Sequence, residues 1–195
     1  MSVFEHLMTL GSFILALGVA SILSFASTLV HRRREVRMSA PVLLWAGAIF
    51  LHQIVFWLAA YQFQATQAAN YMSIGFVVAQ PLLLYLQSAT VVTDASASLD
   101  LPAHHARNAR VYIALVALST TLDIAFFAHL SVLEPEAHLS RIFASMGVAL
   151  ASSLAALAFQ RQRWIQIGAP AAHVALQTSA LYYAAKPLML SSGLV

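Results

Sequence analysis

The sequence contains no cysteine and very few charged residues. Without cysteine the chain has no disulfides, thiolate metal sites, iron–sulfur clusters or thiol redox chemistry. Charged residues make up 9% of the 195 positions, whereas a soluble domain carries about 25%. A chain of this length exposes much of its surface, so a buried core cannot account for the missing charge. Most of the surface is therefore expected to face something other than water.

The sequence also lacks the basic readout face of a nucleic-acid-binding protein. The net charge is +3, but the basic residues stand in short clusters between apolar runs. This distribution argues against a nucleic-acid partner. The first residues, Met1 to His6, carry no basic stretch typical of a cleavable signal. The first apolar run is therefore expected to stay in the protein as a helix.

Hydrophobic residues make up 61% of the chain, and its mean hydropathy is +0.78. About six apolar segments are long enough to cross a hydrocarbon core of about 30 Å at 1.5 Å per residue. These expected spans lie near 7–30, 41–63, 71–93, 109–131, 140–160 and 169–191. The sequence predicts an all-α polytopic membrane protein, a compact helix bundle that forms a single transmembrane domain over residues 1–195.

The charge of the connecting segments alternates along the chain. The first, third and fifth connections hold the basic residues that act as topology signals, namely Arg32, Arg33, Arg34, Arg107, Arg110, Arg161 and Arg163. The second connection is uncharged and the fourth is acidic. Short basic loops remain in the cytoplasm. We therefore expect both termini on the non-cytoplasmic side, in a bacterial inner membrane.

The first and last hairpins of this bundle can be aligned without gaps. Gly18 then falls on Gly147 and Arg32 falls on Arg161, with basic connections of equal length. The match predicts parallel repeats, and hence a bundle built of helical hairpins. The alternative is that every cytoplasmic hairpin needs arginines and that alanine-rich helices match by chance.

Ionisable residues inside a span are costly in lipid and are therefore candidates for function. Asp123 lies about 13 residues beyond Arg110, which places it roughly 20 Å into the membrane. Lys186 in the last span is expected at a similar depth, so the two could form a pair. Such a pair would belong to a proton- or ion-coupled site, or would be a structural tie between two helices. Otherwise Lys186 would extend outward to the membrane surface.

His52 and Gln80 complete the predicted polar core. His52 is expected near mid-membrane, where it could relay protons or ligate a metal or haem. No second histidine is expected at the same depth, and a hydrogen bond to a neighbouring helix is the simpler interpretation. Gln80 precedes Pro81, which interrupts its span. Interrupted helices frequently line transporter sites, although prolines are also common in membrane helices without such a role.

The sequence predicts no catalytic residue, because it holds neither Gly-x-Ser-x-Gly nor His-Glu-x-x-His. His6, His129 and His138 are weak candidates for a metal site at the outer face; solvated loop residues are the alternative. The cofactor stays unknown. Retinal on Lys186 is disfavoured, because microbial rhodopsins carry seven spans.

The polar core favours a small transport protein, a channel or carrier for a proton, an ion or a small solute. One alternative is a membrane protein that binds a cofactor or a lipid. Another is a structural or assembly module that pairs with a different membrane protein. The expected partners are the lipid bilayer and either a second copy of the chain or another membrane protein.

Overall fold

The computed structural model describes the backbone of residues 3–63, 71–92, 100–133 and 140–191, and the side chains of 5–60, 74–92, 100–130 and 142–182. Within these ranges the chain is all-helical and contains no strand. The helices are α1 (Val3–His31), α2 (Ala40–Phe63), α3 (Tyr71–Val91), α4 (Leu101–Leu133), α5 (Ser140–Ala158) and α6 (Arg163–Ser191). The expectation of an all-α chain is confirmed over the described residues.

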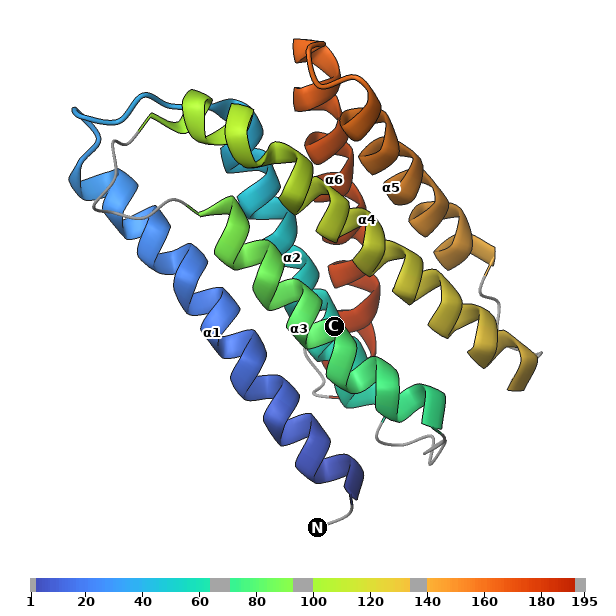
Figure 1. The fold of residues 1–195 in the computed structure, drawn as a ribbon. Helices are drawn as coiled ribbons and strands as arrows, with labels where there is room; N and C mark the ends of the chain where they lie inside the picture. The colour runs from blue at the N-terminus through green and yellow to red at the C-terminus, as the bar shows by residue number, and fades with distance from the viewer. Residues whose placement is uncertain (1–2, 64–70, 93–99, 134–139, 192–195) are drawn as a thin grey trace.

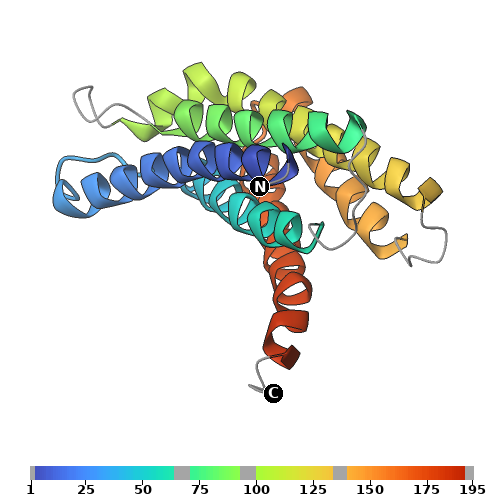
Figure 2. The same cartoon turned by 90° about the horizontal axis from the view of Figure 1, so that it is seen from below.

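The order of the helices in space differs from their order in the chain. α1 packs chiefly along α3, α3 on α4, α4 on α5, α5 on α6, and α6 on α2. α2 also contacts α1, α3 and α4, so it lies closest to the centre of the bundle (Figure 1). The last turns of α6 extend away from the other helices (Figure 2). Residues of α2, α3 and α4 can therefore meet inside the bundle.

Four of these helices are long and apolar enough to cross a membrane, over Glu5–His31, Ala40–Ala60, Ile74–Val91 and Leu101–Leu130. α5 is apolar but shorter, over Ile142–Ala158. Large apolar side chains point outward from these helices, for example Phe13, which is 68% exposed. The chain is thus a multi-pass membrane protein by length and composition, and a count of six spans belongs to the proposal below.

Two apolar clusters fill the interior, one on each side of a polar layer. The first contains Trp45 and Ile49 of α2 with Tyr112 of α4. The second contains Phe56 of α2 and Phe126 of α4, together with Leu15 and Phe76. Polar residues of α2 and α4 stand between these positions in the chain. The fold therefore places a polar layer between two apolar clusters.

The arginine-bearing segments lie together at one end of the bundle. The turn after α1, the start of α4 and the turn between α5 and α6 lie on the same side of the molecule (Figure 1). We call this side the basic end. The first turn of α1 lies at the opposite end, and α6 runs away from the basic end. Positively charged side chains thus gather at one pole of the bundle.

α4 begins at Leu101, earlier than the expected start near 109, so Arg107 and Arg110 lie on a helix rather than in a loop. The Asp100 carboxylate accepts the backbone N–H of Ala103 at 3.0 Å and caps the helix. Pro102 in the first turn also suits a helix start. These two residues are the sequence signal for the earlier boundary.

The cap of α4 also holds the connection between α1 and α2. Arg37 forms an ion pair with Asp100 at 2.8 Å, and Leu101 N–H donates to the carbonyl of Arg37 at 3.1 Å. The Ala103 N–H, and then Arg37, hold the pKa of Asp100 below its ordinary value. The carboxylate is therefore charged throughout the physiological pH range.

The two aligned hairpins differ in structure. Residues 32–39 connect α1 to α2, whereas residues 159–162 connect α5 to α6. The expectation of equal connections is wrong, because α6 already starts at Arg163 and not near 169. In addition, α1 packs mainly on α3, whereas α5 packs on its own hairpin partner as well as on α4. The hairpins share a basic turn but not the same packing.

Candidate functional site

Three of the four residues predicted for the polar core meet in the structure. His52 of α2 and Gln80 of α3 both contact Asp123 of α4. By helical rise, His52 lies about 18 Å along α2 from the basic end, and Gln80 lies about 17 Å along α3. The fourth residue, Lys186, has a side chain outside the described residues, so its pairing with Asp123 stays a prediction.

Direct hydrogen bonds connect this cluster. His52 Nε2 lies 3.1 Å from Asp123 Oδ2, and Gln80 Nε2 donates to Asp123 Oδ1 at 2.9 Å. Gln80 Nε2 also lies 2.7 Å from the Ser119 hydroxyl oxygen. All four side chains are buried, with Gln80 and Ser119 fully so. We call His52, Gln80, Ser119 and Asp123 the polar centre.

His52 and Asp123 can hold one or two protons between them. With Nε2–H donating to Asp123, the pair holds one proton and a net charge of −1, or two protons and no net charge. The bonds from His52 and Gln80 would both stabilise a carboxylate at Asp123. The pair thus brings an imidazole and a carboxyl group into contact inside the bundle.

A second pair of polar residues lies next to the centre on α2 and α3. Gln53 Nε2 donates to the Ser88 hydroxyl at 2.6 Å, and Ser88 donates to the carbonyl of Leu84 at 2.9 Å. Gly18 of α1 packs against Gln53, because a Cβ there would lie 2.7 Å from Gln53 Oε1. The absence of a side chain at Gly18 thus makes room for the buried amide.

Several buried polar atoms near these residues have no protein partner within the described part of the chain. They are Gln53 Oε1, Gln80 Oε1, Gln87 Oε1 and Trp45 Nε1. An unsatisfied buried group costs about 1–3 kcal/mol. These atoms are therefore sites where a water molecule or another polar ligand would be stabilised.

His173 of α6 lies deeper in the bundle than the expected span of 169–191 would place it. Because α6 starts at Arg163, His173 stands about 15 Å along the helix and not near its edge. Its Nε2 lies 2.9 Å from both the carbonyl oxygen of Ala149 and the Ser153 hydroxyl. The Trp45 ring of α2 packs on the His173 ring with centroids 5.1 Å apart. The structure thus places a buried histidine against α2 that the sequence did not indicate.

A further polar network lies toward the basic end, in the first turns of α4. The Tyr112 hydroxyl contacts His105 Nδ1, and His105 Nε2 lies 3.2 Å from Gln166 Oε1. Gln166 Nε2 donates to the carbonyl of Ala156 at 2.7 Å, which fixes the amide orientation. His105 therefore carries its proton on Nε2, and Tyr112 donates to Nδ1.

Aromatic rings close the other side of the polar centre. Phe126, one turn beyond Asp123 on α4, stacks on Phe76 of α3 with ring centroids 3.9 Å apart. Phe56 of α2 packs against Phe76 at 5.7 Å. We call Phe56, Phe76 and Phe126 the aromatic cluster. Among the described residues, it lies between the polar centre and the end of the bundle opposite the basic end.

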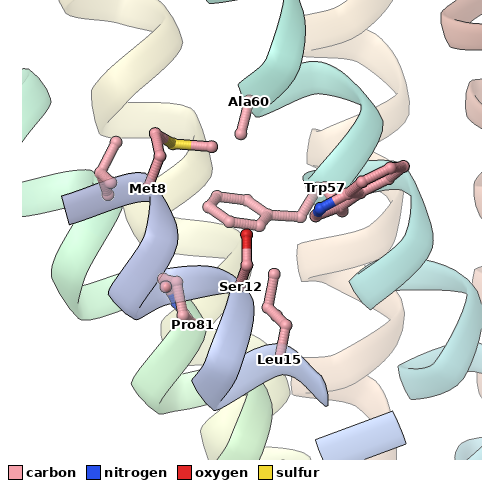
Figure 3. A pocket seen from close by; sticks show the side chains of 9 residues that line it. Met8, Ser12, Leu15, Trp57, Ala60 and Pro81 are labelled. Carbon is pink, nitrogen blue, oxygen red and sulfur yellow. The ribbon is translucent and has the colours of Figure 1, made fainter. Parts of the chain in front are cut away.

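A small hollow opens between α1, α2 and α3 on this same side (Figure 3). Apolar side chains dominate its lining, and Phe56 forms part of its wall. Figure 3 shows Met8, Leu15 and Trp57 around it, with Ser12 as its hydroxyl-bearing member. The hollow carries no ionisable side chain, so nothing in its lining would bind an ion.

The described residues contain no group of three or more His, Asp or Glu side chains that could hold a metal. His6 and His129 therefore belong to no such group, and His138 lies outside the described residues. His52 and His173 both engage Nε2 in hydrogen bonds. Each would have to give up that bond, or use Nδ1, to ligate haem.

No protein-family model, curated protein or solved structure matches the chain, so the functional argument depends on the geometry alone.

Sequence reasoning missed Ser119, Tyr112 and His173 as members of the polar interior. His105, Tyr112 and Ser119 recur at seven-residue intervals, which places them on one face of α4. That spacing is the sequence signal that could have identified Tyr112 and Ser119. His173 could be identified only once the structure showed that α6 starts at Arg163.

Proposed function

We propose that the protein transports protons, or a small solute coupled to protons, across a membrane through the polar centre. The bundle crosses the membrane six times, with both termini on the non-cytoplasmic side of a bacterial inner membrane. The observation that carries the proposal is the hydrogen bond between His52 and Asp123, buried where three helices meet. Ionisable residues buried in membrane helices mark ion or proton pathways.

The remaining contacts support a centre that changes its protonation state. Gln80 donates to Asp123 and Ser119, so one amide contacts both α4 positions. In either protonation state a hydrogen bond between His52 Nε2 and Asp123 Oδ2 can be kept. A proton can therefore enter or leave without the helices losing their contacts. Transport of a proton through the centre requires that the surrounding groups rearrange little, that is, a low reorganisation energy.

The proposed orientation in the membrane follows from the arginines at the basic end. Arg33, Arg107 and Arg161 are exposed there, as arginines facing cytoplasmic water and lipid headgroups would be. The outward apolar side chains, such as Phe13 and Leu118, suit contact with lipid tails.

Replacement of Asp123 tests the proposal. Purified protein in liposomes with an internal pH-sensitive dye should acidify the interior under an inward-driving membrane potential. Asp123→Asn preserves size and one acceptor oxygen but removes the ionisable group, so the flux should fall at least about 10-fold. Thr120→Val is the matched control, because the Thr120 hydroxyl bonds only within α4, to the Val116 carbonyl. Its flux should equal that of the wild type.

One specific observation favours a different function, a structural or assembly module. The polar centre is closed by direct hydrogen bonds, as a tie between helices would be. If Asp123→Asn left the flux unchanged and only lowered the unfolding temperature, the tie would be its role. Absence of any proton flux in the wild type would likewise refute transport of protons.

A further inference from the structure

We propose that the basic end binds an anionic phospholipid at the place where α4 meets the turn between α5 and α6. Arg110, Arg161 and Arg163, which we call the arginine cluster, hold the phosphate group of this lipid. The outer faces of α4 and α5 hold its acyl chains. The proposal uses only the membrane character of the chain and the residues at the basic end, so it does not depend on proton transport.

The first support is a hydrogen bond between α4 and the turn that follows α5. Arg110 donates from Nε to Gln160 Oε1 at 2.9 Å. Arg161 follows Gln160 directly, and Arg163 is the first residue of α6. All three arginine side chains are exposed. The bond thus brings the guanidinium group of α4 next to the turn that carries the other two.

The carboxylates at the basic end do not neutralise the arginine cluster. Glu35 pairs with Arg32 and Asp100 pairs with Arg37, each at 2.8 Å. Within the described residues the cluster itself forms no ion pair. Its N–H groups are therefore available to a phosphate group, which guanidinium binds through parallel hydrogen bonds.

Two further features of this place suit an anion. α6 begins at Arg163, so the positive end of its helix dipole lies at the arginine cluster. The amide that accepts from Arg110 also carries Gln160 Nε2, which has no acceptor among the residues that the structure describes. Gln160 is only partly buried. Its amide can therefore turn toward a phosphate oxygen that binds beside Arg110.

A buried network fixes the position of the arginine cluster. Gln166 of α6 donates from Nε2 to the carbonyl of Ala156 in α5 at 2.7 Å. Its Oε1 lies 3.2 Å from His105 Nε2 of α4. One side chain thus connects the three helices that carry or flank the cluster. The cluster is therefore positioned before a lipid binds, which reduces the entropy lost on binding.

The outer faces of α4 and α5 continue from the cluster as apolar surface. Beyond Arg110, α4 exposes Val111 and Leu118, each about half exposed. On α5, Leu154 and Val148 are exposed to a similar extent. The two helices pack on each other and run side by side away from the basic end (Figure 1). A lipid with its phosphate at the cluster therefore lays its acyl chains along these faces.

Exposed aromatic side chains flank the arginines at the same level. Trp164, next to Arg163, is 73% exposed, and Phe159, next to Gln160, is 49% exposed. Tryptophan is enriched at the depth of the lipid headgroups, where its ring meets apolar chains and its N–H meets water. Trp164 thus marks the level at which the phosphate lies.

The charges select an anionic lipid over a zwitterionic one. A choline or ethanolamine headgroup carries a positive charge beside its phosphate. The arginine cluster repels that charge, and both carboxylates described at the basic end are already paired. Phosphatidylglycerol presents the phosphate without a cation and is therefore the probe for the test.

Trp164 provides the signal for this test. Purified protein in detergent is titrated with phosphatidylglycerol or phosphatidylcholine whose acyl chains carry bromine, which quenches tryptophan fluorescence on contact. Trp164→Phe identifies the contribution of this residue, because Trp45 is buried and Trp57 lies about 25 Å along α2 from the basic end. Phosphatidylglycerol should quench Trp164 at a concentration at least about 10-fold lower than phosphatidylcholine does.

Substitutions of single arginines locate the binding site. Arg110→Gln and Arg161→Gln should each raise the phosphatidylglycerol concentration for half-quenching about fivefold, the equivalent of about 1 kcal/mol per basic residue. Arg33→Gln is the matched control. It removes the same charge from an exposed arginine of the basic end, in the turn after α1, which lies across the basic end from the α5–α6 turn (Figure 1). Its titration should equal that of the wild type.

Three results would overturn the proposal. Equal quenching by the two lipids would show that the charge of the headgroup is not recognised. Equal losses in Arg33→Gln and Arg110→Gln would show attraction to the total charge rather than to this site. Displacement of the brominated lipid by millimolar inorganic phosphate would show a site for soluble anions. Absence of proton flux would refute the proposed function and leave the lipid site standing.

Discussion

At the scale of single residues, Gly18 shows how closely the helices approach around a buried amide. Gly18→Ala places a Cβ 2.7 Å from Gln53 Oε1. Gln53 cannot move away freely, because it is buried and donates to Ser88. We expect a loss of about 1–3 kcal/mol in the free energy of unfolding, as for other overpacked sites. Thermal unfolding in detergent measures it, as a lower midpoint.

Gly147 provides the matched control, because the hairpin alignment pairs it with Gly18. A Cβ at Gly147 meets no atom within 4 Å. Gly147→Ala should therefore leave the midpoint unchanged or raise it, since alanine favours a helix by about 0.5–1 kcal/mol. Equal losses at both positions would show that the two hairpins pack alike after all.

At the scale of the element, the start of α4 depends on Asp100. Asp100→Asn keeps a capping oxygen for Ala103 but removes the charge that pairs with Arg37, whereas Asp100→Ala removes both. We expect Asp100→Ala to lower the unfolding midpoint by about 2–4 °C and Asp100→Asn by less. Circular dichroism during heating compares the two variants. A larger effect of Asp100→Asn would contradict the capping role.

The same carboxylate makes stability depend on pH. The pKa of Asp100 is lowered in the folded protein, first by the Ala103 N–H and then by Arg37. A lowered pKa stabilises the fold above the unfolded value of 3.8 and loses this effect as the pH falls through the folded value. The difference in midpoint between wild type and Asp100→Ala should therefore shrink in strong acid and be larger at neutral pH.

At the scale of the whole molecule, the orientation in the membrane is open to a direct measurement. The chain has no cysteine, so a single introduced thiol reports its own position. Glu5 is exposed in the first turn of α1, and Arg33 is exposed in the turn that follows its last residue. In intact cells a membrane-impermeant maleimide should label Glu5→Cys, and should label Arg33→Cys only after the membrane is permeabilised. The reverse pattern would place the termini in the cytoplasm and reject the proposed topology.

The sequence alone was sufficient for the helical class and most helix positions. Runs of apolar residues are a local property, and a span needs only enough of them to match the hydrocarbon thickness. The boundaries failed where a local cap or an extended helix intervened, at Asp100 for α4 and at Arg163 for α6. At α6 the expected start was wrong by about two turns, so the sequence did not indicate that His173 is buried.

The sequence also determined which polar residues merit attention, because His52, Gln80 and Asp123 are conspicuous in apolar surroundings at similar depth. Only the tertiary structure decided that His52 and Gln80 both contact Asp123, that Ser119 joins them, and that phenylalanines pack beside them. Depth follows from counting residues along a helix. Rotation about the helix axis and the choice of neighbours depend on packing between distant segments, which no local pattern specifies.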